Sequence, residues 1–188
     1  METLAVFGGS FNPPHVAHTM VCLWVLETQA VDRVAVVPCF RHPFDKALAP
    51  FADRLEMCAR AMAPLGGRAF VDDIEEEIDP GDGTPSLTLN TLEALARRHP
   101  DARLRLVIGA DILPERDKWW RWPDIEALAP PVVVGRAGYP APPDWGPLPL
   151  MPEVSSTEIR ARLGRGEDTV GLLSRAVAAY VEEKRLYR

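Results

Sequence analysis

The chain has 188 residues, of which 47% are hydrophobic and 26% are charged, and its formal net charge at pH 7 is -6. This length and apolar content predict one compact domain with a sizeable core. The negative charge argues against a broad nucleic-acid surface, so any phosphate binding must be local. No apolar run approaches the length of a membrane span, and no basic segment with an apolar core opens the chain, so we expect a cytoplasmic protein with no membrane partner.

The three cysteines are expected to be reduced, buried apolar residues. Cys22, Cys39 and Cys58 are odd in number and contain no C-x-x-C pair. A disulfide framework and a zinc knuckle are therefore both disfavoured.

The first predicted strand, residues 3–7, runs into a glycine turn at Gly8 and Gly9. Glycines have no Cβ, so a ligand or another backbone segment can approach the chain closely. Pro13 and Pro14 then suit the first turn of a helix, and the free amides of that turn would point at an anion. The stretch FGGSFNPPHVAH therefore predicts a phosphate-binding turn.

Two histidines, His15 and His18, are expected on one face of the following helix because they are three residues apart. They could bind phosphate, form part of a metal site, or pack for structural reasons alone. A metal pair would need a third ligand nearby, and no Cys, Asp or Glu stands at a suitable spacing. The adjacent Gly-Gly turn favours phosphate. Neither a G-x-G-x-x-G fingerprint nor a P-loop is present.

Strands and helices alternate along the rest of the chain, which predicts an α/β fold with a doubly wound, Rossmann-like parallel sheet and helices on both faces. Further strands are expected at residues 33–37, 69–71, 104–108 and 131–134, with a short one near 148–151, and helices at 51–62 and from a cap at Ser86 to about Arg98. Gly109 and Asp111 directly follow the 104–108 strand. In a parallel sheet they would share an edge with Gly8, where such folds bind ligands.

A run of acidic residues stands before and within the turn at residues 79–85. It comprises Asp72, Asp73, Glu75, Glu76, Glu77, Asp79 and Asp82. Charge runs of this kind are usually solvent-exposed, so we expect a solvated face rather than a metal site.

The second informative motif is VSSTEIR at residues 154–160. Ser155 or Ser156 can cap a helix that continues through Leu163, leaving the Thr157 hydroxyl and the first-turn amides free for an anion. Arg160, one turn further on, could reach the same phosphate with its planar guanidinium. An ordinary capped helix would give the same pattern.

These motifs resemble those of the nucleotidyltransferase superfamily, whose members transfer AMP or CMP from a nucleoside triphosphate to a phosphate or an alcohol. FGGSFNPPHVAH resembles the signature G-[ST]-F-D-P-x-H-x-G-H, with Asn12 in place of Asp and Ala17 in place of Gly. VSSTEIR resembles the I-S-S-T-x-I-R element that binds triphosphate in adenylyltransferases. The ATP-binding residues implied in this way are Gly8, Gly9, Ser10, Phe11, His15, His18, Gly109, Asp111, Ser156, Thr157 and Arg160.

Within the superfamily the chain is most similar to the nicotinate mononucleotide adenylyltransferase family. The matching segments are ADRLEM at 52–57, TPSLTLNTL at 84–92, IGAD at 108–111, WWRW at 119–122 and AAYVEEKRLY at 178–187. The resemblance implies that the mononucleotide contacts Asn12, Lys46, Thr88, Trp119 and Arg136, with Trp119 stacked on the pyridine ring. Trp122 is expected in the core. Leu87 stands where the family usually has Tyr, and Asp45 where His is common.

The implied reaction is adenylyl transfer from ATP to nicotinate mononucleotide, which gives deamido-NAD and pyrophosphate in NAD biosynthesis. His15, His18, Lys46 and Arg160 are the implied catalytic groups, and Mg²⁺ would be bound mainly through the ATP phosphates, with no metal site in the protein. The alternatives are a different acceptor, nicotinamide mononucleotide or phosphopantetheine, and a non-catalytic nucleotide-binding protein. We expect one domain over residues 1–188, with the helical part 155–188 carrying SSTEIR. The sequence leaves a homo-oligomer open.

Overall fold

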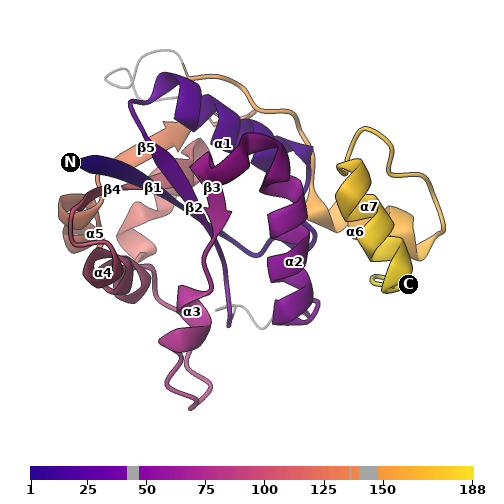
Figure 1. Cartoon of the computed structure of the whole chain (residues 1–188), viewed down its shortest axis with the longest axis horizontal. Helices are drawn as coiled ribbons and strands as arrows, with labels where there is room; N and C mark the ends of the chain where they lie inside the picture. The colour runs from indigo at the N-terminus through magenta and orange to yellow at the C-terminus, as the bar shows by residue number, and fades with distance from the viewer. Residues whose placement is uncertain (42–46, 136, 140–147) are drawn as a thin grey trace.

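A five-stranded parallel sheet forms the centre of the computed structural model, which describes residues 1–41, 47–135, 137–139 and 148–188 (Figure 1). The strands are β1 (Glu2–Gly9), β2 (Arg33–Pro38), β3 (Ala69–Val71), β4 (Ala102–Gly109) and β5 (Pro131–Val134). They are arranged in the order β3-β2-β1-β4-β5, and every pair is parallel. The predicted Rossmann-like fold is confirmed. The order reverses between β1 and β4, which is where open sheets of this kind bind ligands at their carboxyl edge.

Helices cover both faces of the sheet, because its strands are apolar on both sides. One face packs against α1 (Val16–Thr28), α2 (Phe51–Met62), α6 (Ser156–Gly164) and α7 (Arg175–Glu183). The other packs against α3 (Ile74–Glu77), α4 (Thr88–Arg98) and α5 (Trp122–Leu128). Short 3₁₀ helices, η1 (Ala63–Arg68) and η2 (Ala110–Lys118), join these elements. In Figure 1, α2 lies on one side of the strands and α4 and α5 on the other. No helix in the described ranges is both long and apolar enough to cross a membrane.

Two predicted elements differ from the structure. The strand expected near residues 148–151 is reduced to a single bridge between Gly135 and Leu150. Pro149 and Pro152 flank this position, and neither has an N–H to donate to a ladder. Helix α4 begins at Thr88 with Leu87 at its N-cap, not at Ser86. Ser86 instead donates its backbone N–H to the Arg41 carbonyl oxygen, at 3.2 Å.

The expectation of a solvated acidic face is wrong for Asp72 and Glu75, which are only 6% and 9% exposed. Asp72 accepts a hydrogen bond from the backbone N–H of Ile74 and forms an ion pair with Arg98. Burial is tolerated here because one local donor, the Ile74 N–H, and one distant donor, Arg98, satisfy the carboxylate. Glu75 is satisfied in the same way, and it lies at the candidate site.

Candidate active site

The turn after β1 is tight because Phe11 folds back over Gly9. Phe11 has a φ of 44°, in the left-handed region, and its ring is buried. A Cβ added at Gly9 would come within 3.2 Å of this ring, a contact tight enough that the ring would have to move by a few tenths of an ångström. At Gly8 an added Cβ would meet no atom within 4 Å. A non-glycine residue with positive φ is strained and is retained where the surroundings require it. The fold thus packs one side of the turn and leaves the Gly8 backbone approachable.

The two histidines form a stacked pair at the start of α1. Their ring centroids are 3.7 Å apart, and the rings are within 20° of parallel. The backbone N–H of His15 donates to Nδ1 of His18 at 3.0 Å. His15 is therefore the N-cap in extended conformation, and the prediction that it lies within the helix is wrong. With Nδ1 accepting, neutral His18 carries its proton on Nε2, which is then the donor available to an anion.

Burial sets the charge of this pair. Desolvation lowers the pKa of His15 to about 4, and desolvation together with the neighbouring His15 lowers the pKa of His18 well below its usual range. Both imidazoles are thus neutral near pH 7 in the free protein. A bound polyanion would favour their charged forms, because an opposite charge close to an imidazole raises its pKa.

The N-terminal turn of helix α6 packs on the FNPPH turn, residues 11–15, although the two are separated by more than 140 residues. The Ser156 hydroxyl donates to the Pro13 carbonyl oxygen at 2.9 Å. Nη1 of Arg160 donates to the Asn12 carbonyl oxygen at 2.7 Å, and Nη2 donates to the Thr157 hydroxyl at 3.3 Å. Ser155 is the cap, accepting from the Glu158 N–H, and the start of the helix lies beside the turn after β1. Anion binding by this helix start stays a prediction.

Sequence reasoning missed Arg54, which is 1% exposed and organises the same edge from α2. Its Nη1 donates to the carbonyl oxygens of Ser10 and Cys39, and its Nε to that of Ala49. Burial lowers the pKa of this guanidinium. The signal was present in the sequence, because helical spacing places Arg54 on the buried face of α2 with Met57 and Cys58.

A second buried charge, Glu75, links the end of β2 to α4. Its carboxylate accepts from the Phe40 N–H at 2.9 Å and from the Thr91 hydroxyl at 3.2 Å, and also from the side chains of Ser86 and Cys39. Burial raises the pKa of Glu75. The carboxylate borders a cavity of about 40 Å³ that Gly8 and Thr88 also line. Gly8, which is predicted to contact ATP, and Thr88, which is predicted to contact the mononucleotide, thus line the same cavity.

The other residues that are predicted to bind ligands lie around the carboxyl edge of the sheet. Gly109 ends β4, and a side chain there would collide with the carboxylate of Asp111 in the first turn of η2. Trp122 is buried, as predicted, and the half-buried Trp119 packs edge-on against it with centroids 5.9 Å apart. Trp120 is 51% exposed.

The predicted contacts also include Lys46, Arg136 and Asn12. Lys46 and Arg136 lie outside the described residues. Asn12 is 2% exposed, and its amide is hydrogen-bonded to Ala47, Ala49 and Tyr187. Its contact with the mononucleotide stays a prediction. Within the described residues, no group of three or more His, Cys, Asp or Glu side chains could bind a metal ion.

A parallel sheet whose switch-point edge carries a glycine turn, a neutral histidine pair and a helix N-terminus defines a nucleotide-binding protein of the Rossmann-like class. The comparisons with known proteins agree. The family model described as "Cytidylyltransferase-like" matches residues 6–162. A protein of Anaeromyxobacter sp. (strain K), described as "Probable nicotinate-nucleotide adenylyltransferase", is 54% identical over 185 residues, which are 98% of this chain and 96% of the relative. A protein of Myxococcus xanthus with the same description is 44% identical over 184 residues, 98% and 94% of the two chains.

The fold is also that of a solved enzyme. The structure of "Plasmodium falciparum nicotinic acid mononucleotide adenylyltransferase complexed with NaAD" matches with a TM-score of 0.81 at 19% identity, covering 100% of this chain and 98% of that one. The chain therefore belongs to the cytidylyltransferase-like family and, within it, to the nicotinate-nucleotide adenylyltransferases.

The buried histidine makes stability depend on pH in a defined window. The pKa of His15 is about 4 in the folded chain against an ordinary 6.5. Between these values the unfolded chain binds more protons, so stability falls as pH drops from about 6.5 to about 4, by up to about 3 kcal/mol from this group. Urea unfolding at several pH values measures the slope of the free energy of unfolding against pH. His15→Asn should reduce this slope and leave the part that the second buried imidazole, His18, contributes. An unchanged slope in that variant would assign the dependence to other groups.

Proposed function

We propose that this chain transfers the adenylyl group of MgATP to nicotinate mononucleotide, forming deamido-NAD and pyrophosphate, and that residues 1–188 act as one nucleotidyltransferase domain. The observation that carries the proposal is the docking of α6 on the FNPPH turn through Ser156–Pro13 and Arg160–Asn12. This docking brings two anion-binding elements, the turn with its histidines and the start of α6, to one edge of the sheet. One triphosphate can then contact both.

The chemistry needs no nucleophile from the enzyme. An oxygen of the acceptor 5′-phosphate forms a bond to the α-phosphorus of ATP, and the bond from that phosphorus to the bridging oxygen of pyrophosphate breaks in line. The acceptor is already mostly dianionic at pH 7, since the second pKa of a phosphate monoester is about 6. Catalysis therefore consists of positioning two anions and neutralising the charge that develops between them.

Neutralisation falls to His15, His18 and Arg160, together with Lys46. The Nε2–H of His18 donates to the triphosphate, and the pair gains positive charge as the anion binds. Arg160 contributes a permanent charge from α6. Mg²⁺ enters as part of the substrate, bound by phosphate oxygens and water.

The remaining contacts position the two nucleosides. Backbone groups of the glycine turn and the Ser156–Thr157 amides bind the phosphates of ATP, and Asp111 accepts from the ribose hydroxyls of its adenosine. Trp119 stacks on the pyridine ring of the acceptor, with Thr88 and Arg136 completing its pocket. Trp119 is suited to stacking because one part of it is anchored on Trp122 while the rest is only half-buried.

The function is tested by incubating the purified chain with ATP, Mg²⁺ and nicotinate mononucleotide and measuring pyrophosphate release. We expect turnover, with kcat/KM higher for nicotinate mononucleotide than for nicotinamide mononucleotide or phosphopantetheine. No pyrophosphate above background with any acceptor would contradict an enzymatic function. A higher kcat/KM with another acceptor would reassign the substrate.

His18→Ala should lower kcat about 100-fold while the affinity for ATP changes little, because the imidazole contributes most where charge develops in the transition state. Single-turnover rates and titration of a non-hydrolysable ATP analogue separate the two effects. His99→Ala, remote from the glycine turn at the end of α4, is the control. Equal losses of turnover and affinity in His18→Ala would contradict a transition-state role.

Trp119→Ala should raise the KM for the mononucleotide about two- to tenfold and leave the KM for ATP unchanged, since only the acceptor ring stacks on this indole. Trp120→Ala is the matched control, because Trp120 is adjacent in sequence and 51% exposed. Steady-state kinetics with each substrate varied in turn gives both constants. Similar effects of the two substitutions would exclude a specific stacking role for Trp119.

A further inference from the structure

The side chain of Asn12 forms three hydrogen bonds inside the protein. Oδ1 accepts from the Ala49 backbone N–H at 3.0 Å and from the Tyr187 hydroxyl at 2.8 Å, while Nδ2 donates to the Ala47 carbonyl oxygen at 3.3 Å. The two backbone partners fix the orientation of the amide, because an N–H can only donate and a carbonyl can only accept. Asn12 is 2% exposed, so no water replaces a lost partner easily.

This pattern explains why an amide is present where the superfamily signature has a carboxylate. An aspartate at position 12 could accept from Ala49 and Tyr187, but its second oxygen would face the carbonyl oxygen of Ala47. Two acceptors at that separation repel each other in a buried site. The amide therefore fits the segment 47–49 as it is placed here better than a carboxylate would.

Asn12 connects three parts of the chain at the candidate active site. Its side chain is hydrogen-bonded to the segment 47–49 and to the C-terminal tail, the residues 184–188 that follow α7. Its backbone carbonyl accepts from Arg160 of α6. Arg54 reinforces the first link, since it donates to the carbonyl oxygens of both Ser10 and Ala49. The glycine turn thus depends on residues 47–49 and on the tail for its position.

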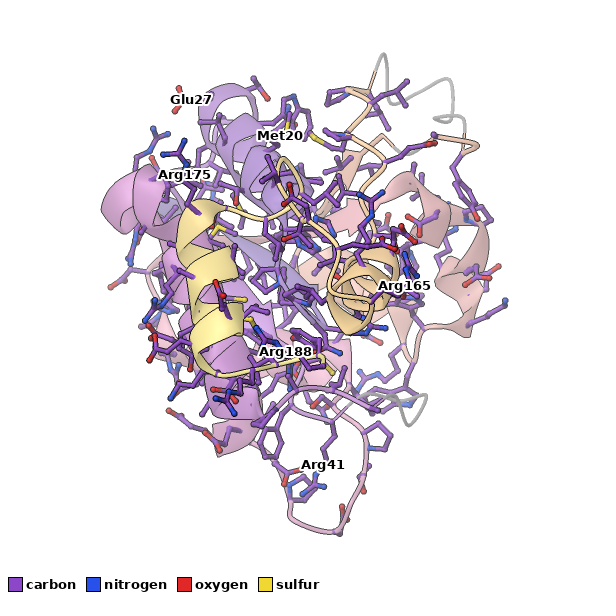
Figure 2. All side chains as sticks on the ribbon, turned by 90° about the vertical axis from the view of Figure 1, so that its right-hand side faces the viewer. Met20, Glu27, Arg41, Arg165, Arg175 and Arg188 are labelled. Carbon is purple, nitrogen blue, oxygen red and sulfur yellow. The ribbon has the colours of Figure 1, made fainter. Side chains whose placement is uncertain are left out.

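The tail is itself well anchored. The Leu186 N–H donates to the Val181 carbonyl oxygen at 3.0 Å, and Leu186 and Tyr187 pack against the core. The backbone of Tyr187 approaches the end of α6, where a Cβ on Gly164 would lie 3.7 Å from its carbonyl oxygen. Figure 2 shows the tail, labelled at Arg188, crossing from the end of α7 toward α6. Burial raises the pKa of the Tyr187 phenol, so its hydroxyl remains a donor across the physiological range.

We propose that Tyr187 is a positioning residue for adenylyl transfer: its hydroxyl, acting through Asn12, fixes the FNPPH turn and residues 47–49 in the arrangement that the reaction requires. The inference rests on the proposed function. Tyr187 touches no reacting atom in this scheme. Its role is to hold the amide of Asn12 so that the turn presents His15 and His18 in one geometry, and small displacements of such groups cost turnover more than binding.

Tyr187→Phe in the full chain tests the proposal, because it removes the hydroxyl and keeps the ring. We expect kcat to fall about tenfold, with the KM values for ATP and nicotinate mononucleotide within about twofold of the parent, as one buried acceptor loses a partner. Tyr180→Phe is the matched control. Tyr180 also donates its hydroxyl to a side chain on another helix, Asp53 at 2.7 Å, and it is also on the C-terminal segment. It should lose similar thermal stability and keep its kcat.

Two further measurements separate positioning from general destabilisation. In an Asn12→Ala background, Tyr187→Phe should lower kcat no further, because the hydroxyl acts through Asn12. Hydrogen exchange at residues 47–54 requires no turnover and should speed up in Tyr187→Phe but not in Tyr180→Phe. An unchanged kcat or an additive double variant would overturn the proposal while leaving the function intact. An inactive parent chain would overturn the proposed function. If hydrogen exchange at residues 47–54 were also unchanged in Tyr187→Phe, the proposed role of Tyr187 in positioning this segment would be overturned as well.

Discussion

The docking of α6 onto the turn after β1 is the interaction on which the candidate site depends. Ser156 and Arg160 donate to the carbonyl oxygens of Pro13 and Asn12, two adjacent acceptors in a turn that lacks the N–H groups of two prolines. These bonds close the chain on itself, because the turn is near the beginning and α6 near the end. The proposed triphosphate site needs both motifs, since each would offer amides or charge on one side of the anion only.

Two buried charges give the edge of the sheet its shape. Arg54 donates hydrogen bonds to carbonyl oxygens of the turn and of the chain after β2. Glu75 accepts hydrogen bonds from the chain after β2 and from α4. A buried charge is costly unless it is satisfied, so each one restricts the loops to arrangements that supply its partners. The turn after β1 and the start of α4 are therefore both held to the chain segment that follows β2.

Much of the fold could be predicted from the sequence, because apolar runs bounded by glycine and proline mark β1, β2, β4 and β5, and the parallel order places their ends at one edge. The histidine pair was singled out by its spacing and the adjacent Gly-Gly turn, and VSSTEIR by its capping pattern together with a family resemblance. The exact start of α1 could not be predicted, since the imidazole of His18 holds His15 at the N-cap. The burial of Glu75 could not be predicted either. A charge run looks the same whether its donors are water or, as here, Phe40 and Thr91 from distant segments.

The most direct test of the shared triphosphate site is a crystal structure of the chain with a non-hydrolysable ATP analogue and Mg²⁺. The triphosphate should lie between His18 and the first turn of α6, with the guanidinium of Arg160 turned toward it. A nucleotide found elsewhere would contradict this site, for example in the cavity of about 570 Å³ at the opposite edge of the sheet, where Arg103 and Arg105 lie. So would a triphosphate that contacts the glycine turn but leaves α6 without a phosphate contact.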